Sequence, residues 1–342
     1  MADEQPRSAK RALVIDTLSD VLRAVRLNGA IFFAVDASPP WVAETPESRL
    51  VAPHILPGVE HVIEYHVITA GSCWGGRIDE PAVKLEAGDV IVFPQGDSHV
   101  LSSAPGMRGE PSVEAFRAVK DARLPLALAI DGGGAERTQM ICGFLGCDAR
   151  PFNPLLASLP RVIHLPAAGT ETTVFRRLVE LAVDESTARA AGSDCALSRL
   201  SELLFVEVVR RYVGTLPPDH RGWFAALRDD TIGRALQRLH ERPAHDWSLE
   251  ELAKQVGLSR STLAERFAHF VGIPPIQYLA QWRIQLAANL LRSGKSGLAE
   301  IADRVGYGSE AALSRAFKRQ VGVAPDQYRR AGGDVSAASA SG

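Results

Sequence analysis

The chain reads Leu252-Ala253-Lys254-Gln255-Val256-Gly257 and, 49 residues later, Ile301-Ala302-Asp303-Arg304-Val305-Gly306. Beyond the glycine the spacing becomes 50 residues. The matching pairs are then Leu263 with Leu313, Phe267 with Phe317, Gly272 with Gly322, Pro275 with Pro325 and Tyr278 with Tyr328. An internal repeat of this kind indicates that one structural unit is built twice.

Each copy has the residues that a helix-turn-helix requires. Ala253 is small enough to let two helices cross closely, Gly257 can end the first helix in the left-handed conformation, and Ser259 can cap the second helix. The second copy has the same three residue types in the same order. The second helix buries Leu263 and Phe267 and leaves its opposite face free, which is the geometry that enters a DNA major groove.

The segment 301–329 resembles the signature of the AraC/XylS family of bacterial transcription regulators. The residues that carry the resemblance are Ala302, Gly306, Tyr307, Ser314-Arg315-Ala316-Phe317-Lys318, Gly322, Pro325 and Tyr328-Arg329. The resemblance implies a double-stranded DNA-binding domain at 221–330. Its helix-turn-helix units would lie at 248–271 and 298–321, joined by one long helix at 275–292.

The resemblance also implies which residues contact DNA. Base readers are expected at Ser261, Ala264, Glu265, Glu310, Ala311 and Arg315. Arg315 can pair with guanine, and Glu265 can accept a hydrogen bond from the cytosine amine. Arg260, Arg266, Lys318 and Arg319 are expected on phosphates, which position the domain without reading sequence. The alternative for each residue is a solvated helix face.

The net charge of −2 over the 342 residues is the sum of an acidic N-terminal part and a basic C-terminal part. Residues 223–330 contain 16 Lys and Arg against 11 Asp and Glu, whereas residues 1–222 contain 22 against 28. A basic C-terminal part fits a nucleic-acid partner. Four cysteines and a polar start favour a reducing cytoplasm over disulfide stapling. No apolar run is long enough to span a membrane.

The N-terminal part is predicted to be a β-sandwich or small barrel, with strands at 31–35, 62–69, 90–93 and 138–144. The string from Gly88 to His99 resembles the second motif of the cupin barrel, although Ser103 stands where Asn is usual. The first cupin motif is only partly present, because Gly58 and Glu60 occupy the places of its two histidines. Residues 16–165 look like the cupin-type sensor domain of one branch of AraC-like regulators, which implies sensing of a small-molecule effector.

Four side chains are predicted to line the sensor's effector pocket. Alternation puts Glu64 and His66 on one strand face, and a two-residue hairpin at 70–71 would turn Cys73 toward them. The cupin resemblance adds His99. With Cys142 as a fourth donor, His66, Cys73 and His99 form a candidate site for zinc or a similar divalent metal. The alternative is a metal-free ligand pocket.

The sequence therefore predicts an α+β protein in three ordered parts between disordered ends at 1–15 and 331–342. A helical linker at 166–220 follows the sensor domain, and its apolar rows either pack on the barrel or form a homodimer. A contact with RNA polymerase is a further expectation. The rival functions are a cupin metalloenzyme of dioxygenase or isomerase type, a barrel that serves only as a dimerisation scaffold, and a redox switch at Cys73 and Cys142.

Overall fold

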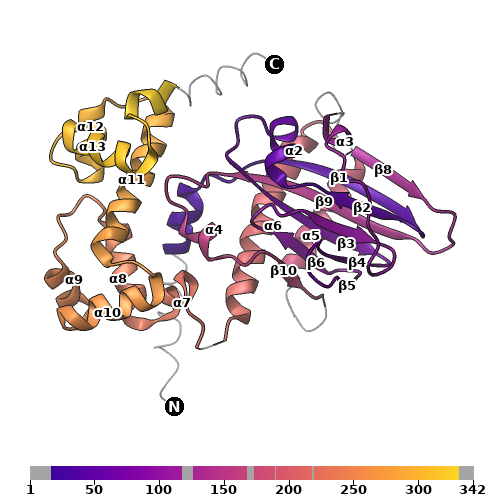
Figure 1. Ribbon diagram of the computed structural model, residues 1–342, viewed down its shortest axis with the longest axis horizontal. Coiled ribbons are helices and arrows are strands. Elements are labelled where there is room, and N and C mark those ends of the chain that lie inside the picture. Colours follow the sequence, from indigo (N-terminus) through magenta and orange to yellow (C-terminus); the bar gives the residue numbers. More distant parts are fainter. Residues whose placement is uncertain (1–16, 118–125, 168–172, 189, 218, 331–342) are drawn as a thin grey trace. The chain divides into compact units, whose positions relative to one another are not determined.

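The computed structural model describes residues 17–117, 126–167, 173–188, 190–217 and 219–330 (Figure 1). The ends predicted to be disordered lie outside the described residues. Contacts divide the chain into two compact units. The β unit comprises 27–148 and 159–215, and the helical unit comprises the described residues among 1–26, 149–158 and 216–342. This division differs from the domain limits expected at 165 and 220, because two short segments flanking the barrel pack with the C-terminal helices.

The β unit is built from two sheets. The six-stranded sheet has the order β10-β6-β3-β9-β1-β8, and the four-stranded sheet has the order β2-β7-β4-β5. All neighbouring strands are antiparallel except β1 and β8. The strands are β1 (Asn28–Ser38), β2 (Val42–Thr45), β3 (His61–Ala70), β4 (Ser72–Arg77), β5 (Val83–Glu86), β6 (Val90–Phe93), β7 (His99–Ser102), β8 (Leu126–Asp131), β9 (Thr138–Cys147) and β10 (Ile163–Leu165). Two short helices, α2 (Ser48–Ile55) and α3 (Glu114–Arg117), lie between strands.

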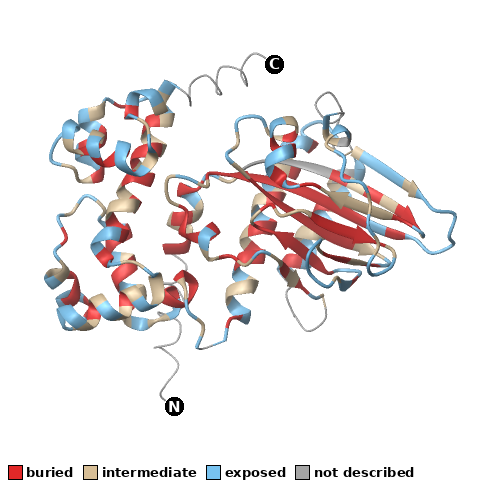
Figure 2. Ribbon diagram, in the orientation of Figure 1, coloured by how far each residue is buried: buried red, intermediate tan, exposed pale blue. Residues whose placement is uncertain are grey.

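Strand β3 has a different role on each of its faces. Val62 and Ile68 belong to the core between the two sheets. Glu64 and His66 lie between them at every second position, so they are on the same face of the strand. Tyr65 and the other alternate residues point to the opposite face. The strand is buried along most of its length, as the red strands of the large sheet in Figure 2 show. Alternation therefore puts Glu64 and His66 inside the barrel, as predicted.

The predicted β-hairpin at residues 70–71 is wrong. β3 pairs with β6 and β9, whereas β4 pairs with β5 and β7 in the other sheet. Gly71, with φ of +73°, turns the chain from one sheet to the other, and a Cβ there would lie 2.1 Å from the carbonyl oxygen of Arg137. Cys73 is nevertheless buried in the barrel core, because the first inward position of β4 also faces the gap between the sheets.

Two helices follow β10 along the chain, α5 (Thr173–Ala188) and α6 (Ser193–Thr215). α6 packs on β1, β9 and β10 and also on α5. The Tyr65 hydroxyl hydrogen-bonds the hydroxyl of Ser201 on α6, so the outer face of the large sheet is covered there. The Tyr65 ring lies over Gly143 of β9, where a Cβ would lie 2.1 Å from the ring.

The helical unit contains the helices α7 to α13, a further short helix at 325–330, and two segments from earlier in the chain. The C-terminal helices are α7 (Trp223–Arg228), α8 (Asp230–Glu241), α9 (Leu249–Val256), α10 (Arg260–Val271), α11 (Pro275–Ser293), α12 (Leu298–Val305) and α13 (Glu310–Val321). The earlier segments carry a helix at 17–24 and α4 (Pro154–Ser158). In Figure 1, α11 runs from the group α8, α9 and α10 to the pair α12 and α13. Among the described residues, no helix combines the length and the apolar character that crossing a membrane requires.

Candidate functional site

Local hydrogen bonds build the two helix-turn-helix motifs as the sequence predicts. The Ser259 hydroxyl accepts from the Thr262 amide at 3.2 Å, and the Ser309 hydroxyl accepts from the Ala312 amide at the same distance. Each serine thereby caps the first turn of its recognition helix, α10 or α13. Gly257 ends α9 with φ of +76° and Gly306 ends α12 with φ of +81°. These turns orient the second helix of each motif.

The two recognition helices bury one face and expose the other. Leu263 and Phe267 of α10 are fully buried, as are Leu313 and Phe317 of α13. Most of the predicted DNA contacts lie on the exposed side of these helices. Arg260, Ser261, Glu265, Glu310, Ala311, Arg315, Lys318 and Arg319 are exposed, and Ala264 and Arg266 are half-buried. This exposure is compatible with groove contacts, and the individual roles stay predictions.

Arg266, a member of this set, forms an ion pair within the protein. Its Nη2 atom lies 2.6 Å from Oδ2 of Asp229. Asp229 also caps α8, accepting from the Ile232 amide at 2.9 Å. The ion pair therefore ties the first recognition helix to the start of α8, a role that the sequence analysis missed because Asp229 lies 37 residues away.

Arg283 is a second residue that sequence reasoning missed. From α11 it donates to the carbonyl of Pro243 at 2.7 Å, to that of His245 at 2.8 Å and to that of Gly306 at 3.0 Å. Gly306 is the turn of the second motif, and the other two carbonyls lie just before the first. Arg283 thus fixes the spacing of the two motifs on one helix. An arginine in an amphipathic helix carries no local signature of this function.

Gln285, also on α11, is fully buried. Its Oε1 atom accepts a hydrogen bond from the Phe152 amide at 3.0 Å, and its Nε2 atom donates to the Ala24 carbonyl at 3.2 Å. Asn289 also donates to the Ala24 carbonyl, at 2.8 Å. Ala24 ends the helix just before β1, and Phe152 follows β9. One side chain of the DNA-reading part therefore holds both chain segments that flank the barrel.

Inside the barrel, Glu64, His66 and His99 converge from both sheets. The His66 and His99 Nε2 atoms lie 2.8 Å apart, and His99 Nε2 lies 3.7 Å from Oε2 of Glu64. Glu64 and His99 are 0% exposed. The His99 ring also stacks on Phe93, with ring centroids 3.9 Å apart. The structure thus joins three of the four residues predicted for the effector pocket.

Hydrogen bonding assigns the tautomers of the two histidines. His99 Nδ1 lies 2.9 Å from the Asp97 carbonyl oxygen, so Nδ1 carries the hydrogen. Neutral His99 then accepts at Nε2 the hydrogen of His66 Nε2. This leaves His66 Nδ1 as an acceptor, and neither that atom nor the Glu64 carboxyl oxygens have a hydrogen-bond partner among the described residues.

Burial sets the protonation of the site. Desolvation lowers the pKa of His99 to about 4, an effect that its hydrogen bond to Asp97 only partly offsets. Desolvation and the neighbouring His99 lower the pKa of His66 well below its usual value. Desolvation also raises the pKa of Glu64 well above its usual value. The site therefore favours a protonated carboxyl beside two neutral imidazoles.

The two inward thiols are held in their protonated form. Burial, with a smaller contribution from Asp89, raises the pKa of Cys73 to about 12. Burial also raises the pKa of Cys142, and the nearby Cys73 and Glu64 reinforce this shift. Since the thiolate is the reactive species, both cysteines are poor nucleophiles in this conformation.

The predicted metal site receives no support from the structure. Among the described residues, no group of three or more His, Cys, Asp or Glu side chains is arranged to hold a metal ion. The Nε2 atoms of His66 and His99 hydrogen-bond each other instead. A zinc site made by these histidines with Cys73 and Cys142 stays a prediction, which metal quantification on the purified protein tests.

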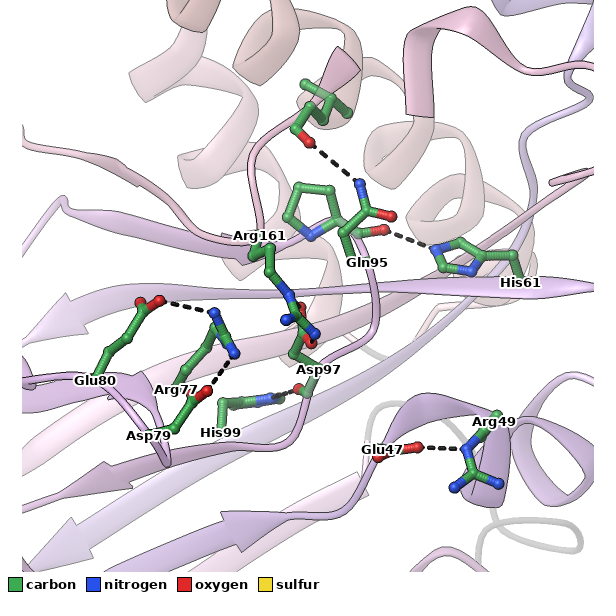
Figure 3. Close-up of polar contacts among 12 residues, drawn as sticks. Glu47, Arg49, His61, Arg77, Asp79, Glu80, Gln95, Asp97, His99 and Arg161 are labelled. Atoms are coloured by element: carbon green, nitrogen blue, oxygen red, sulfur yellow. Dashed lines mark hydrogen bonds and ion pairs between the residues drawn. The ribbon is translucent and has the colours of Figure 1, made fainter. Parts of the chain in front are cut away.

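The turn at Pro94 to Asp97 directly precedes His99, and four side chains hold it (Figure 3). His61 Nε2 bonds the Pro94 carbonyl at 2.7 Å, and Gln95 donates to the Leu159 carbonyl at 3.2 Å. Arg161 pairs with the Asp97 carboxylate. Because His99 also bonds the Asp97 carbonyl, the imidazole is tied to this turn.

The family model described as Cupin matches residues 16–214, more than half of the chain. The model described as Helix-turn-helix domain matches residues 252–331. A putative AraC-like transcription regulator of Streptomyces lividans is 33% identical over 322 residues, which are 92% of this chain and 98% of that protein. The chain belongs to the AraC-like transcription regulators. It is a DNA-binding transcription regulator with a cupin sensor domain, which confirms the predicted family, fold class and general function.

The chain is also similar to a second relative and, in part, to a solved structure. This AraC-like regulator is 29% identical to the HTH-type transcriptional regulator AlkR of Acinetobacter baylyi, over 92% of this chain and 99% of AlkR. Among solved structures, the DNA-binding domain of AdpA in complex with a target DNA is 32% identical. That match covers 30% of this chain and 93% of that chain, with a TM-score of 0.29.

Proposed function

We propose that this regulator reads DNA with the exposed faces of α10 and α13, in two successive major grooves. The observation that carries the proposal is the placement of Arg315, Lys318 and Arg319 opposite the fully buried Leu313 and Phe317. Arg315 is assigned to a guanine and Glu265 to a cytosine amine. Arg260, Lys318 and Arg319 are assigned to phosphates.

The full-length protein, titrated by fluorescence anisotropy with DNA from upstream of its own gene, tests this proposal. Affinity should fall steeply as salt rises, because phosphate contacts release counterions. A protein in which Arg315, Lys318 and Arg319 are all changed to Ala should lose specific binding. Unchanged binding by this folded triple variant would contradict the assignment.

The regulator acts as a homodimer joined through α5 and α6. Val174 and Leu181 of α5 and Leu203 of α6 are between 52% and 55% exposed, an unusual exposure for large apolar side chains on neighbouring helices. α5 and α6 pack against each other, so these residues belong to one helical layer. A second copy of the same layer would bury them symmetrically.

The barrel interior is the receiver of the signal, and it does not catalyse a reaction. The Glu64 carboxyl and the His66 Nδ1 atom lack hydrogen-bond partners among the described residues. A small polar effector that reached them would supply partners to both. The first cupin motif is incomplete, because Gly58 and Glu60 stand where its two histidines are expected. The cupin metalloenzyme is therefore the less favoured function.

The signal reaches the DNA reader through Gln285. The segments that Gln285 holds continue directly into β1 and out of β9, and these strands pair with each other at Asn28 and Gly146. A change in the barrel that shifts this strand pair also shifts the two backbone groups that Gln285 bonds. It thereby acts on α11, the helix that joins the two helix-turn-helix motifs. Coupling of this kind requires that the effector favour one of two arrangements.

A further inference from the structure

A pocket of about 350 Å³ lies outside the barrel and is lined by residues of α5, the end of α6, the end of β3 and the turn before β6. Glu64, His66 and His99 do not line it. Its volume falls within the range of small-molecule sites. The pocket is therefore separate from the candidate effector site in the barrel.

Hydrogen bonds fix one wall of this pocket. The Gly88 amide donates to the Ile68 carbonyl at 2.7 Å, and the Ala167 amide donates to Oδ1 of Asp89 at 2.7 Å. Gly88 has φ of +93°, and a Cβ there would lie 2.7 Å from the Cβ of Ala167. The wall is thus backbone held in place from three segments of the chain, and it is preformed for a ligand.

The opposite wall combines arginine side chains with apolar ones. Arg211 is half-buried, with its guanidinium carbon 4.9 Å from the centre of the Phe175 ring and its Nη2 atom donating to the Pro166 carbonyl at 3.2 Å. Arg176 lines the same pocket, as do Val179 and Glu180. Glu207, one turn before Arg211 on α6, acts on Arg211 electrostatically, but it does not line the pocket and it pairs with Arg210 at 3.8 Å. The side chains that line the pocket include two arginines and one glutamate, so the pocket attracts an anion.

We propose that this pocket binds a small organic carboxylate, with Arg211 as its anchor. The planar guanidinium is suited to pair with a carboxylate, and it is oriented by the Phe175 ring and the Pro166 carbonyl. The apolar body of the ligand lies against Phe175 and Val179. This site is separate from the proposed DNA-reading function. Because ligand binding can be measured without DNA, the carboxylate proposal and the DNA-reading proposal can each fail without the other.

Titration calorimetry on the full-length protein tests the site with three probes of one length: hexanoate, 1-hexanol and hexylamine. Hexanoate should bind at least about tenfold more tightly than the alcohol or the amine, because only the carboxylate pairs with an arginine. Equal binding of 1-hexanol, or tighter binding of hexylamine, would overturn the proposal.

Matched variants locate the anchor. Arg211→Gln should weaken hexanoate binding at least about tenfold. Arg210→Gln, at the exposed neighbouring position that faces Glu207 at 3.8 Å, should leave it unchanged. Because Arg211→Gln also removes the bond to Pro166, Val179→Trp gives a second test that keeps Arg211 and fills the pocket. If folded Val179→Trp binds hexanoate as the wild type does, the ligand is elsewhere and the proposal is wrong.

Discussion

Gln285 accepts a hydrogen bond from the backbone amide of Phe152, 133 residues earlier in the chain. The same buried side chain donates to the Ala24 carbonyl, so it links the middle helix of the DNA reader to both chain segments beside the barrel. When Gln285 is removed, the Phe152 amide loses this hydrogen bond, whereas the Ala24 carbonyl keeps the one from Asn289. A hydrophobic replacement of similar size therefore removes both bonds of Gln285 while it preserves the helix.

Gln285→Leu should reduce the free energy of unfolding by about 1–2 kcal/mol, because the half-buried Phe152 loses the hydrogen-bond partner of its amide. Thermal and urea unfolding followed by tryptophan fluorescence measure this loss. Gln277→Leu, at an exposed position of the same helix, is the matched control and should change stability by less than about 0.5 kcal/mol. Equal effects of the two substitutions would show that the bonds of Gln285 contribute nothing specific.

Arg315→Ala should relax discrimination at one base position, at a cost of about 1–3 kcal/mol for the preferred base. Lys318→Ala should weaken binding to all sequences alike and reduce the salt dependence, because a phosphate contact carries no sequence information. Binding to a set of single-base operator variants distinguishes these results. Lys295→Ala, in the turn before the second motif, should leave the base preference unchanged. Identical profiles for Arg315→Ala and Lys318→Ala would refute the assigned roles.

His99 should lower the stability of the β unit as the pH drops from about 6.5 toward 4. His99 has a native pKa of about 4, so in this interval the unfolded chain binds a proton that the folded chain does not. His99 alone accounts for a loss on the order of 3 kcal/mol. The lowered pKa of His66 acts in the same direction, whereas the raised pKa of Glu64 acts in the opposite direction. His99→Gln should flatten the pH dependence in urea unfolding. His269→Gln, at an exposed site, should not.

Leu181→Glu combined with Leu203→Glu should convert the proposed dimer to a monomer, because each substitution puts a carboxylate into the proposed apolar contact. Sedimentation velocity measures the change. Ile78→Glu is the control, since this side chain is 42% exposed but directly follows β4 and belongs to neither α5 nor α6. A double variant that sediments as the wild type would contradict the helical dimer contact.

The parts that could be predicted are those with a local sequence signature. The Gly and Ser pair at each turn, such as Gly257 and Ser259, predicted both helix-turn-helix motifs, because capping and left-handed turns depend on neighbouring residues. Strand β6 was predicted at its observed limits from an apolar run between a glycine turn and a proline. The alternation of β3 correctly placed Glu64 and His66 inside the barrel.

The parts that were missed depend on residues far apart in the sequence. Arg283 and Gln285 look like ordinary polar positions of an amphipathic helix, and their partners are distant backbone groups that have no residue-type signature. The β3 and β4 strands were expected to form a hairpin because two-residue turns usually join paired strands, but Gly71 passes the chain between sheets. Local spacing does not distinguish these two outcomes.

The chain passes between its two units four times, at residues 26, 148, 158 and 215. A protein whose domains follow one another in sequence can be cut or recombined at a single joint. Here any C-terminal fragment that starts after residue 215 lacks the segments that cover Gln285, and exposes a polar contact built for burial. Exchange of the sensor during evolution, or in a chimeric biosensor, therefore has to transfer the 17–26 and 149–158 segments along with the DNA reader to which they are bound.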